Sequence, residues 1–226
     1  ALAFGAQQTH RAQADREQAK ERATAQWENQ GDKNPHVAAH YGTYVFAPTT
    51  AATAVDPGVS AYLGRAVKIE AHRRNLAAHS EAQDGAALQR LGDFSVATVL
   101  LLLIPLLIIA LGYGLWSRER ERGTLRQLLS TGVDRRALFW GKALALAGVV
   151  AALLVPAALV ILAVLWVLGG GDGETLTRLA LLGLSYGTYF AIFGGITLYA
   201  SAASPSSRAA LVALVGVWGL FCLIAP

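Results

Sequence analysis

Two histidines, His36 and His40, are spaced four residues apart, which places both imidazoles on one face if the segment is helical. Imidazole nitrogens are common ligands of zinc and other transition metals. A metal site needs further ligands, however. The chain offers one cysteine and three other histidines, His10, His72 and His79, and it has no His-Glu-x-x-His motif. The pair therefore favours ordinary hydrogen-bonded histidines, and we expect no metal site.

A glycine-rich turn at residues 169–174 has a composition that phosphate-binding loops share. It lacks the Gly-Lys-Ser/Thr ending that such loops use, and the chain contains no G-x-x-x-x-G-K-[ST] sequence. We therefore expect no catalytic residue and no bound cofactor in this chain. We also expect that the chain is not an enzyme by itself.

The densest cluster of charge lies in residues 117–142, between two apolar runs that are each long enough to cross a bilayer. This stretch holds seven basic and three acidic residues, and the excess of four equals the formal net charge of +4 of the whole chain. Short loops rich in arginine stay in the cytoplasm. The charge therefore predicts membrane orientation, and a nucleic-acid partner is not expected.

The same loop has the pattern of a short amphipathic helix. Leu125, Leu128 and Leu129 recur at helical spacing and form one apolar stripe. Gly132 follows, as glycine often does just beyond a helix end, and Asp134 is a suitable N-cap for the next helix. Such a helix suits docking to a soluble partner, and a helix that lies on the lipid surface fits the pattern equally well.

The loop also resembles the first cytoplasmic loop of ABC-type export permeases, the transmembrane subunits of type-2 ABC transporters, in the branch with a large extracytoplasmic loop. The resemblance covers residues 94–226 and rests on these residues: Glu119, Glu121, Gly123, Thr124, Leu125, Leu128, Leu129, Arg135, Arg136, Gly141 and Lys142. It implies that residues 117–136 form a coupling helix that docks into a separate cytoplasmic ATPase subunit, which binds ATP and magnesium. It also implies a second permease, in a homodimer or heterodimer, and export as the direction of transport.

The remaining sequence predicts an all-α polytopic membrane protein, since 54% of its residues are hydrophobic. We expect membrane spans at about 94–116, 137–168, 176–200 and 208–226. Pro105 should kink the first span. None of these spans carries Asp, Glu, Lys or His near its middle, which secondary transporters usually need. The energy source is therefore expected outside this chain.

Residues 7–93 are predicted to form a mainly helical extracytoplasmic domain, which holds ten basic and ten acidic residues. Asp56-Pro57-Gly58 predicts a turn, and Ser60 can cap a helix that runs to about His79. Residues 1–6 are apolar, and we expect them to be the end of a truncated membrane helix. The absence of methionine likewise predicts that the natural protein continues beyond both ends.

In the third span, small residues predict close helix packing, either within the chain or against another subunit. These positions are Gly183, Gly187, Gly194 and Gly195. Two further functions remain open from sequence alone: a membrane-anchored sensor, and an ATP-driven complex that transmits force to envelope proteins without moving a solute. We expect a multi-pass location in the bacterial inner membrane among its lipids, and the sequence does not identify a substrate.

Overall fold

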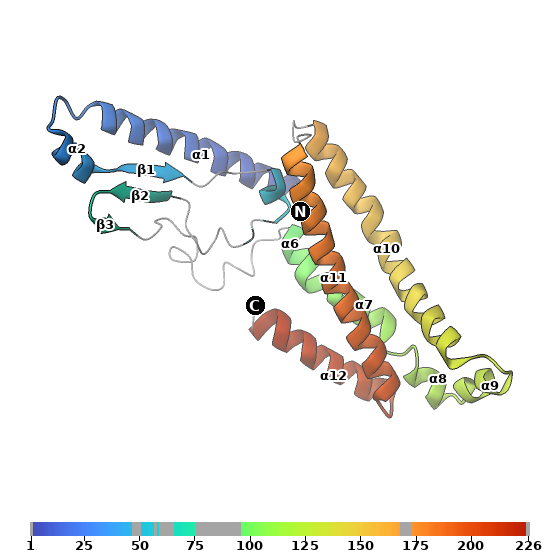
Figure 1. The fold of residues 1–226 in the computed structure, drawn as a ribbon. Helices are drawn as coiled ribbons and strands as arrows, with labels where there is room; N and C mark the ends of the chain where they lie inside the picture. Colours follow the sequence, from blue (N-terminus) through green and yellow to red (C-terminus); the bar gives the residue numbers. More distant parts are fainter. Residues whose placement is uncertain are drawn as a thin grey trace. The chain divides into compact units, whose positions relative to one another are not determined.

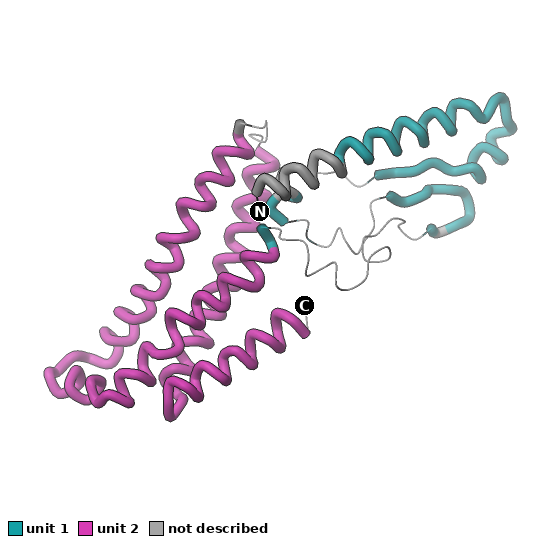
Figure 2. Tube along the Cα trace, turned by 180° about the vertical axis from the view of Figure 1, so that it is seen from behind, with its two compact units in different colours: residues 1–97 teal, residues 98–226 magenta. Residues whose placement is uncertain are grey.

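The computed structural model describes residues 2–46, 51–56, 58, 66–75, 96–167 and 173–224 of the 226. Residues 169–172 of the glycine-rich turn lie outside the described residues. The chain divides into two compact units, unit 1 at residues 1–97 and unit 2 at residues 98–226, drawn in teal and magenta in Figure 2. The boundary therefore falls near the start of the first long apolar run.

Unit 1 combines helices with a small antiparallel sheet (Figure 1). Its helices are α1 (Leu2–Glu28), α2 (Pro35–Tyr41) and the short 3-10 helix η1 (Ala51–Ala54). Its strands are β1 (Thr43–Phe46), β2 (Ala66–Glu70) and β3 (Arg73–Arg74), hydrogen-bonded in that order. Helix α2 begins where the Asn34 side chain accepts a hydrogen bond of 2.9 Å from the backbone N–H of His36, with Pro35 at the first helical position.

The helix expected from Ser60 to His79 is wrong over residues 66–75. Residues 66–70 form β2 instead, with Val45 of β1 opposite Val67. The sequence Ala-Val-Lys-Ile-Glu alternates apolar and polar residues and contains two β-branched ones, both of which favour a strand. The other residues of that predicted helix lie outside the described residues.

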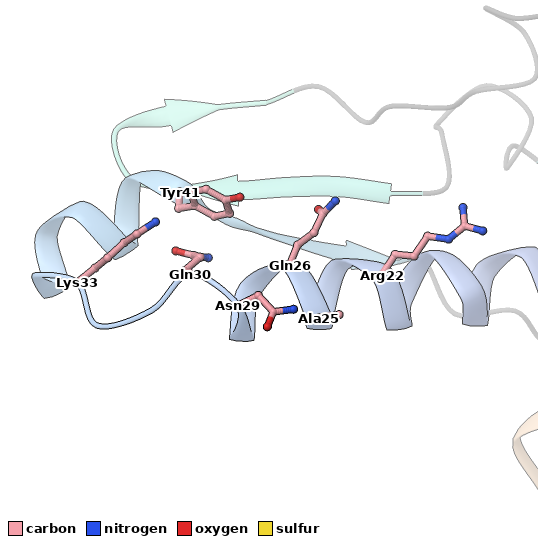
Figure 3. A pocket seen from close by; sticks show the side chains of 7 residues that line it. All are labelled: Arg22, Ala25, Gln26, Asn29, Gln30, Lys33 and Tyr41. Carbon is pink, nitrogen blue, oxygen red and sulfur yellow. The ribbon is translucent and has the colours of Figure 1, made fainter.

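An open pocket of about 540 Å³ lies between the end of α1 and Tyr41 of α2 (Figure 3). Its lining includes three side-chain amides and two cations, and its residues are Arg22, Ala25, Gln26, Asn29, Gln30, Lys33 and Tyr41. The Lys33 ammonium lies 4.7 Å from the centroid of the Tyr41 ring, so this cation already has an aromatic partner.

The described residues contain four helical stretches long and apolar enough to cross a membrane, which confirms the predicted all-α polytopic class. The first stretch joins α6 (Val96–Thr98), the π-helical η2 (Val99–Leu103), α7 (Ile104–Gly112) and α8 (Ser117–Glu121). The others are α10 (Arg135–Val167), α11 (Gly173–Ala203), and α12 (Ser207–Gly219) with its π-helical continuation η3 (Leu220–Ile224).

The core of unit 2 joins all four stretches. Its buried members are Ile104, Ile108, Ile109, Leu146, Val150, Phe193, Leu198 and Leu214. Helices α7 and α11 pack closely at Gly112, where an added Cβ would clash with Cγ2 of Thr197. Only glycine fits between the two helices there without a shift of its neighbours.

Pro105 changes the first span by releasing a backbone carbonyl. Proline has no N–H to donate to the carbonyl of Leu101 four residues earlier, and the preceding turn is π-helical. The hydroxyl of Tyr189 on α11 donates to this Leu101 carbonyl at 3.0 Å, and the indole N–H of Trp218 on α12 donates to the Leu102 carbonyl, also at 3.0 Å. Neighbouring helices thus supply the donors that lipid does not offer.

Candidate functional site

The predicted docking loop forms two short helices: α8 ends the first stretch, and α9 (Thr124–Ser130) follows it (Figure 1). Gly123 links them with φ of +76°, and Gly132 follows α9 with φ of +85°. Asp134 then accepts a hydrogen bond of 3.4 Å from the N–H of Ala137 at the start of α10. The predicted helix end and N-cap are confirmed.

Gly123 is needed for its backbone conformation. No atom of the described chain lies within 4 Å of a Cβ built at this position, so space is not what selects glycine. Glycine is selected by the left-handed backbone conformation, because residues with a side chain adopt that conformation rarely. Gly123 therefore sets the direction in which α9 leaves α8, and Thr124 supports it through a 3.3 Å hydrogen bond from its hydroxyl to the Glu119 carbonyl.

The apolar stripe of α9 is only partly covered. Leu125 and Leu129 are half-buried, and 37% of Leu128 is exposed. Arg126 and Gln127 on the same helix are exposed. Helix α9 therefore presents an exposed leucine with polar side chains beside it, which fits an interface with an apolar core and a polar rim.

Helix α8 is fastened to both ends of the turn between α11 and α12. The guanidinium of Arg120 donates to the carbonyls of Ala202 and Ser204, at the C-terminal end of α11. The carboxylate of Glu121 accepts 2.9 Å hydrogen bonds from both the backbone N–H and the hydroxyl of Ser207, at the N-terminal end of α12.

Each of these charges has the sign that its helix end attracts. A helix end leaves carbonyls or N–H groups without an internal partner, and its dipole favours a cation at the C-terminus and an anion at the N-terminus. Arg120 and Glu121 therefore match α11 and α12 respectively. We call these two side chains, with the α11–α12 turn that they hold, the α8 clamp.

A buried serine pair lies next to the clamp. The hydroxyl of Ser201 on α11 accepts hydrogen bonds from the N–H groups of Trp116 (3.0 Å) and Ser117 (3.4 Å), and the Ser117 hydroxyl donates to the Tyr113 carbonyl at 2.9 Å. Both serines are fully buried. This pair satisfies the first N–H groups of α8 by a side chain of α11.

Lys142 ties the loop to α10. Its ammonium lies 2.6 Å from a carboxylate oxygen of Glu119 and donates to the Leu115 carbonyl, also at 2.6 Å. Only 9% of Lys142 is exposed, and its ammonium lies 5.2 Å from the centroid of a Trp116 ring. The structure thus brings together Glu119 and Lys142, which lie far apart in the predicted motif.

In the part of the chain that the structure describes, the four predicted packing glycines of α11 have open space where a side chain would stand. No atom of the described residues lies within 4 Å of a Cβ built at Gly183, Gly187, Gly194 or Gly195. The close approach inside the chain uses Gly112 instead, which the sequence analysis missed. The available signal was a glycine directly before Tyr113 and one helical turn before Trp116.

Among the described residues, four helical stretches are long and apolar enough to cross a membrane and a charged helical loop is held against them, which are the features of a polytopic membrane protein. The family model for the ABC-2 family transporter protein matches residues 1–226, so the chain belongs to the ABC-2 transporter family. The comparisons of this chain with the curated proteins and with the solved structures found no match.

Proposed function

We propose that this chain is the permease subunit of an ATP-driven exporter and that residues 117–136 couple it to a separate ATPase subunit. The observation that carries the proposal is the combination of an anchored α8 with an open α9. Arg120, Glu121 and Glu119 hold α8 to α11, α12 and α10, while Leu128 of α9 keeps an exposed apolar side chain. A displacement of α9 by the ATPase subunit would be transmitted through α8 to α10, α11 and α12.

The partner subunit in this proposal lies in the cytoplasm and binds ATP and magnesium. Leu125, Leu128 and Leu129 form the apolar centre of its contact, with Arg126 at the polar rim. Glu119 and Glu121 take the role of positioning residues, because their carboxylates are bonded within the chain. Gly123 and Thr124 set the angle of the docking helix.

A second permease completes the proposed transporter in the bacterial inner membrane. Gly183, Gly187 and Gly195 on α11 are exposed and have open space around them. Much of α10 is exposed and apolar as well, including Leu144 and Leu159. These surfaces are available to lipid and to the second permease.

The proposed function requires the 117–136 loop inside the cell and unit 1 outside it. In a Cys222→Ala background, we expect Asn29→Cys to react with a membrane-impermeant maleimide on intact cells. Arg126→Cys should react only after the membrane is opened, because translocating an arginine-rich loop is costly. Both positions are exposed, so accessibility to the reagent depends on the side of the membrane. Labelling of Arg126→Cys on intact cells would contradict the proposed orientation and with it the coupling role.

A further inference from the structure

Three of the chain's histidines lie together in unit 1. His36 and His40 come from α2, and His72 comes from the turn between β2 and β3, which Figure 1 shows beside α2. The ring centroids are 4.8 Å apart for His36 and His40, 5.3 Å for His40 and His72, and 6.3 Å for His36 and His72. The fold thus supplies the third imidazole that the spacing of His36 and His40 could not.

The distance between the first two rings suits a shared metal ion. The Nε2 atoms of His36 and His40 are 3.3 Å apart. Two imidazole nitrogens bound to one tetrahedral zinc at about 2.0–2.1 Å lie about 3.3–3.4 Å from each other. A direct hydrogen bond between the two rings is the competing explanation, and 3.3 Å is longer than the usual range for an N–H donor.

His72 occupies a backbone conformation that favours glycine. Its φ is +63°, and it is the one described non-glycine residue with a positive φ. Such a conformation in a residue with a side chain is uncommon and often marks a functional position. The backbone N–H of the preceding residue, Ala71, donates to the Ala39 carbonyl in the middle of α2 at 2.9 Å, which holds the turn against the helix that carries the other two rings.

The frame around the three rings is fixed from both ends of α2. Asn34 caps its start, and Gly42 ends it with φ of +71°. A Cβ at Gly42 would lie 2.7 Å from the Ile69 carbonyl oxygen, so glycine allows α2 and β2 to approach closely. The positions of the three histidine backbones are therefore set before any ligand binds, which lowers the cost of binding.

We propose that His36, His40 and His72 bind one divalent transition-metal ion of the class that prefers imidazole, such as zinc or copper. Among the described residues, no three His, Cys, Asp or Glu side chains are placed so that they could hold a metal ion without moving. The exposed His72 side chain closes the site by rotating toward the Nε2 atoms of His36 and His40, and water takes the remaining position. The proposal concerns unit 1 and does not depend on the coupling role of unit 2.

The test is a calorimetric titration of the purified full chain in detergent with zinc, followed by cobalt as a spectroscopic probe. We expect one zinc per chain, and visible cobalt absorption of tetrahedral intensity. His36→Ala, His40→Ala and His72→Gly should each weaken zinc binding by at least about tenfold, since removal of even an outer-sphere partner costs about 10–100-fold. His72→Gly is chosen because glycine adopts the positive φ without strain.

The chain's other two histidines provide matched controls. His10→Ala and His79→Ala should leave zinc affinity and stoichiometry unchanged, and zinc should raise the melting temperature of both, as it does for the unaltered protein. A hydrogen-bonded pair would not depend on the third ring. Zinc binding that is absent in the unaltered protein, or that survives unchanged in His72→Gly, would overturn the proposal.

Discussion

Leu128→Asp is expected to release the ATPase subunit from the purified complex. Leu128 is the exposed member of the leucine stripe on α9, at the proposed centre of the contact. Burying an unpaired carboxylate in an apolar interface costs several kcal/mol, so we expect affinity for the ATPase to fall by roughly 100-fold or more. The membrane-spanning helices are unchanged, so the variant should still insert. The measurement is the ratio of ATPase to permease after affinity purification of the co-expressed pair.

Gln127→Asp is the matched control for this variant. It introduces the same charge at the neighbouring position of α9, where the side chain is already exposed and polar. We expect it to keep the ATPase at the original ratio. Equal retention by Leu128→Asp would show that α9 is not the docking helix, and a helix on the lipid surface would then explain the leucine stripe.

Loss of the α8 clamp should separate ATPase binding from movement of the membrane helices. In the double variant Arg120→Ala and Glu121→Ala, α8 no longer has side chains on the ends of α11 and α12, while α9 is unchanged. We therefore expect the ATPase to remain bound. Allosteric couplings usually amount to about 5–150-fold in an equilibrium, and we expect ATP-driven displacement of α12 to fall by at least about fivefold.

Spin labels on α9 at position 126 and on α12 at position 212 measure whether the two helices move together. Both positions suit labelling, because both native side chains are exposed. With the clamp intact, the two labels should keep one distance in the nucleotide-free and vanadate-trapped complexes, since α8 and the turn move together. The double variant should show a broader distribution of distances after trapping. Arg122→Ala, which removes one charge from the same segment outside the clamp, should behave as the unaltered protein does. An unchanged distribution in the double variant would eliminate the clamp as the connection.

The membrane fold was predictable because it depends on long runs of one kind of residue. Four apolar stretches, each long enough for a bilayer, are visible in the sequence without any tertiary information. The end of α9 and the start of α10 were predictable for a similar reason, since Gly132 and Asp134 act on backbone groups a few residues away. Pro105 was also visible in the sequence, although the side chains that donate to the Leu101 and Leu102 carbonyls were not.

The parts that sequence reasoning missed depend on residues that are distant in the chain. The hydrogen-bond partners of Arg120 and Glu121 lie more than 80 residues later in the chain. The sequence of an arginine-rich loop does not indicate which of its charged side chains are bonded within the protein. The same holds for Gly112, whose contact is on α11. Strand β2 was mistaken for a helix because four residues of alternating polarity, Val67 to Glu70, give a weak signal until β1 is placed beside them.

The coupling role of the loop is tested most directly by photo-crosslinking from position 128. Leu128 is replaced by p-benzoylphenylalanine in the assembled complex, and Leu144, an exposed apolar residue in the interior of α10, is replaced in parallel. Irradiation should attach the ATPase subunit to the permease from position 128, and position 144 should give no such product. An intact, ATP-hydrolysing complex that yields no ATPase adduct from position 128 would contradict the account.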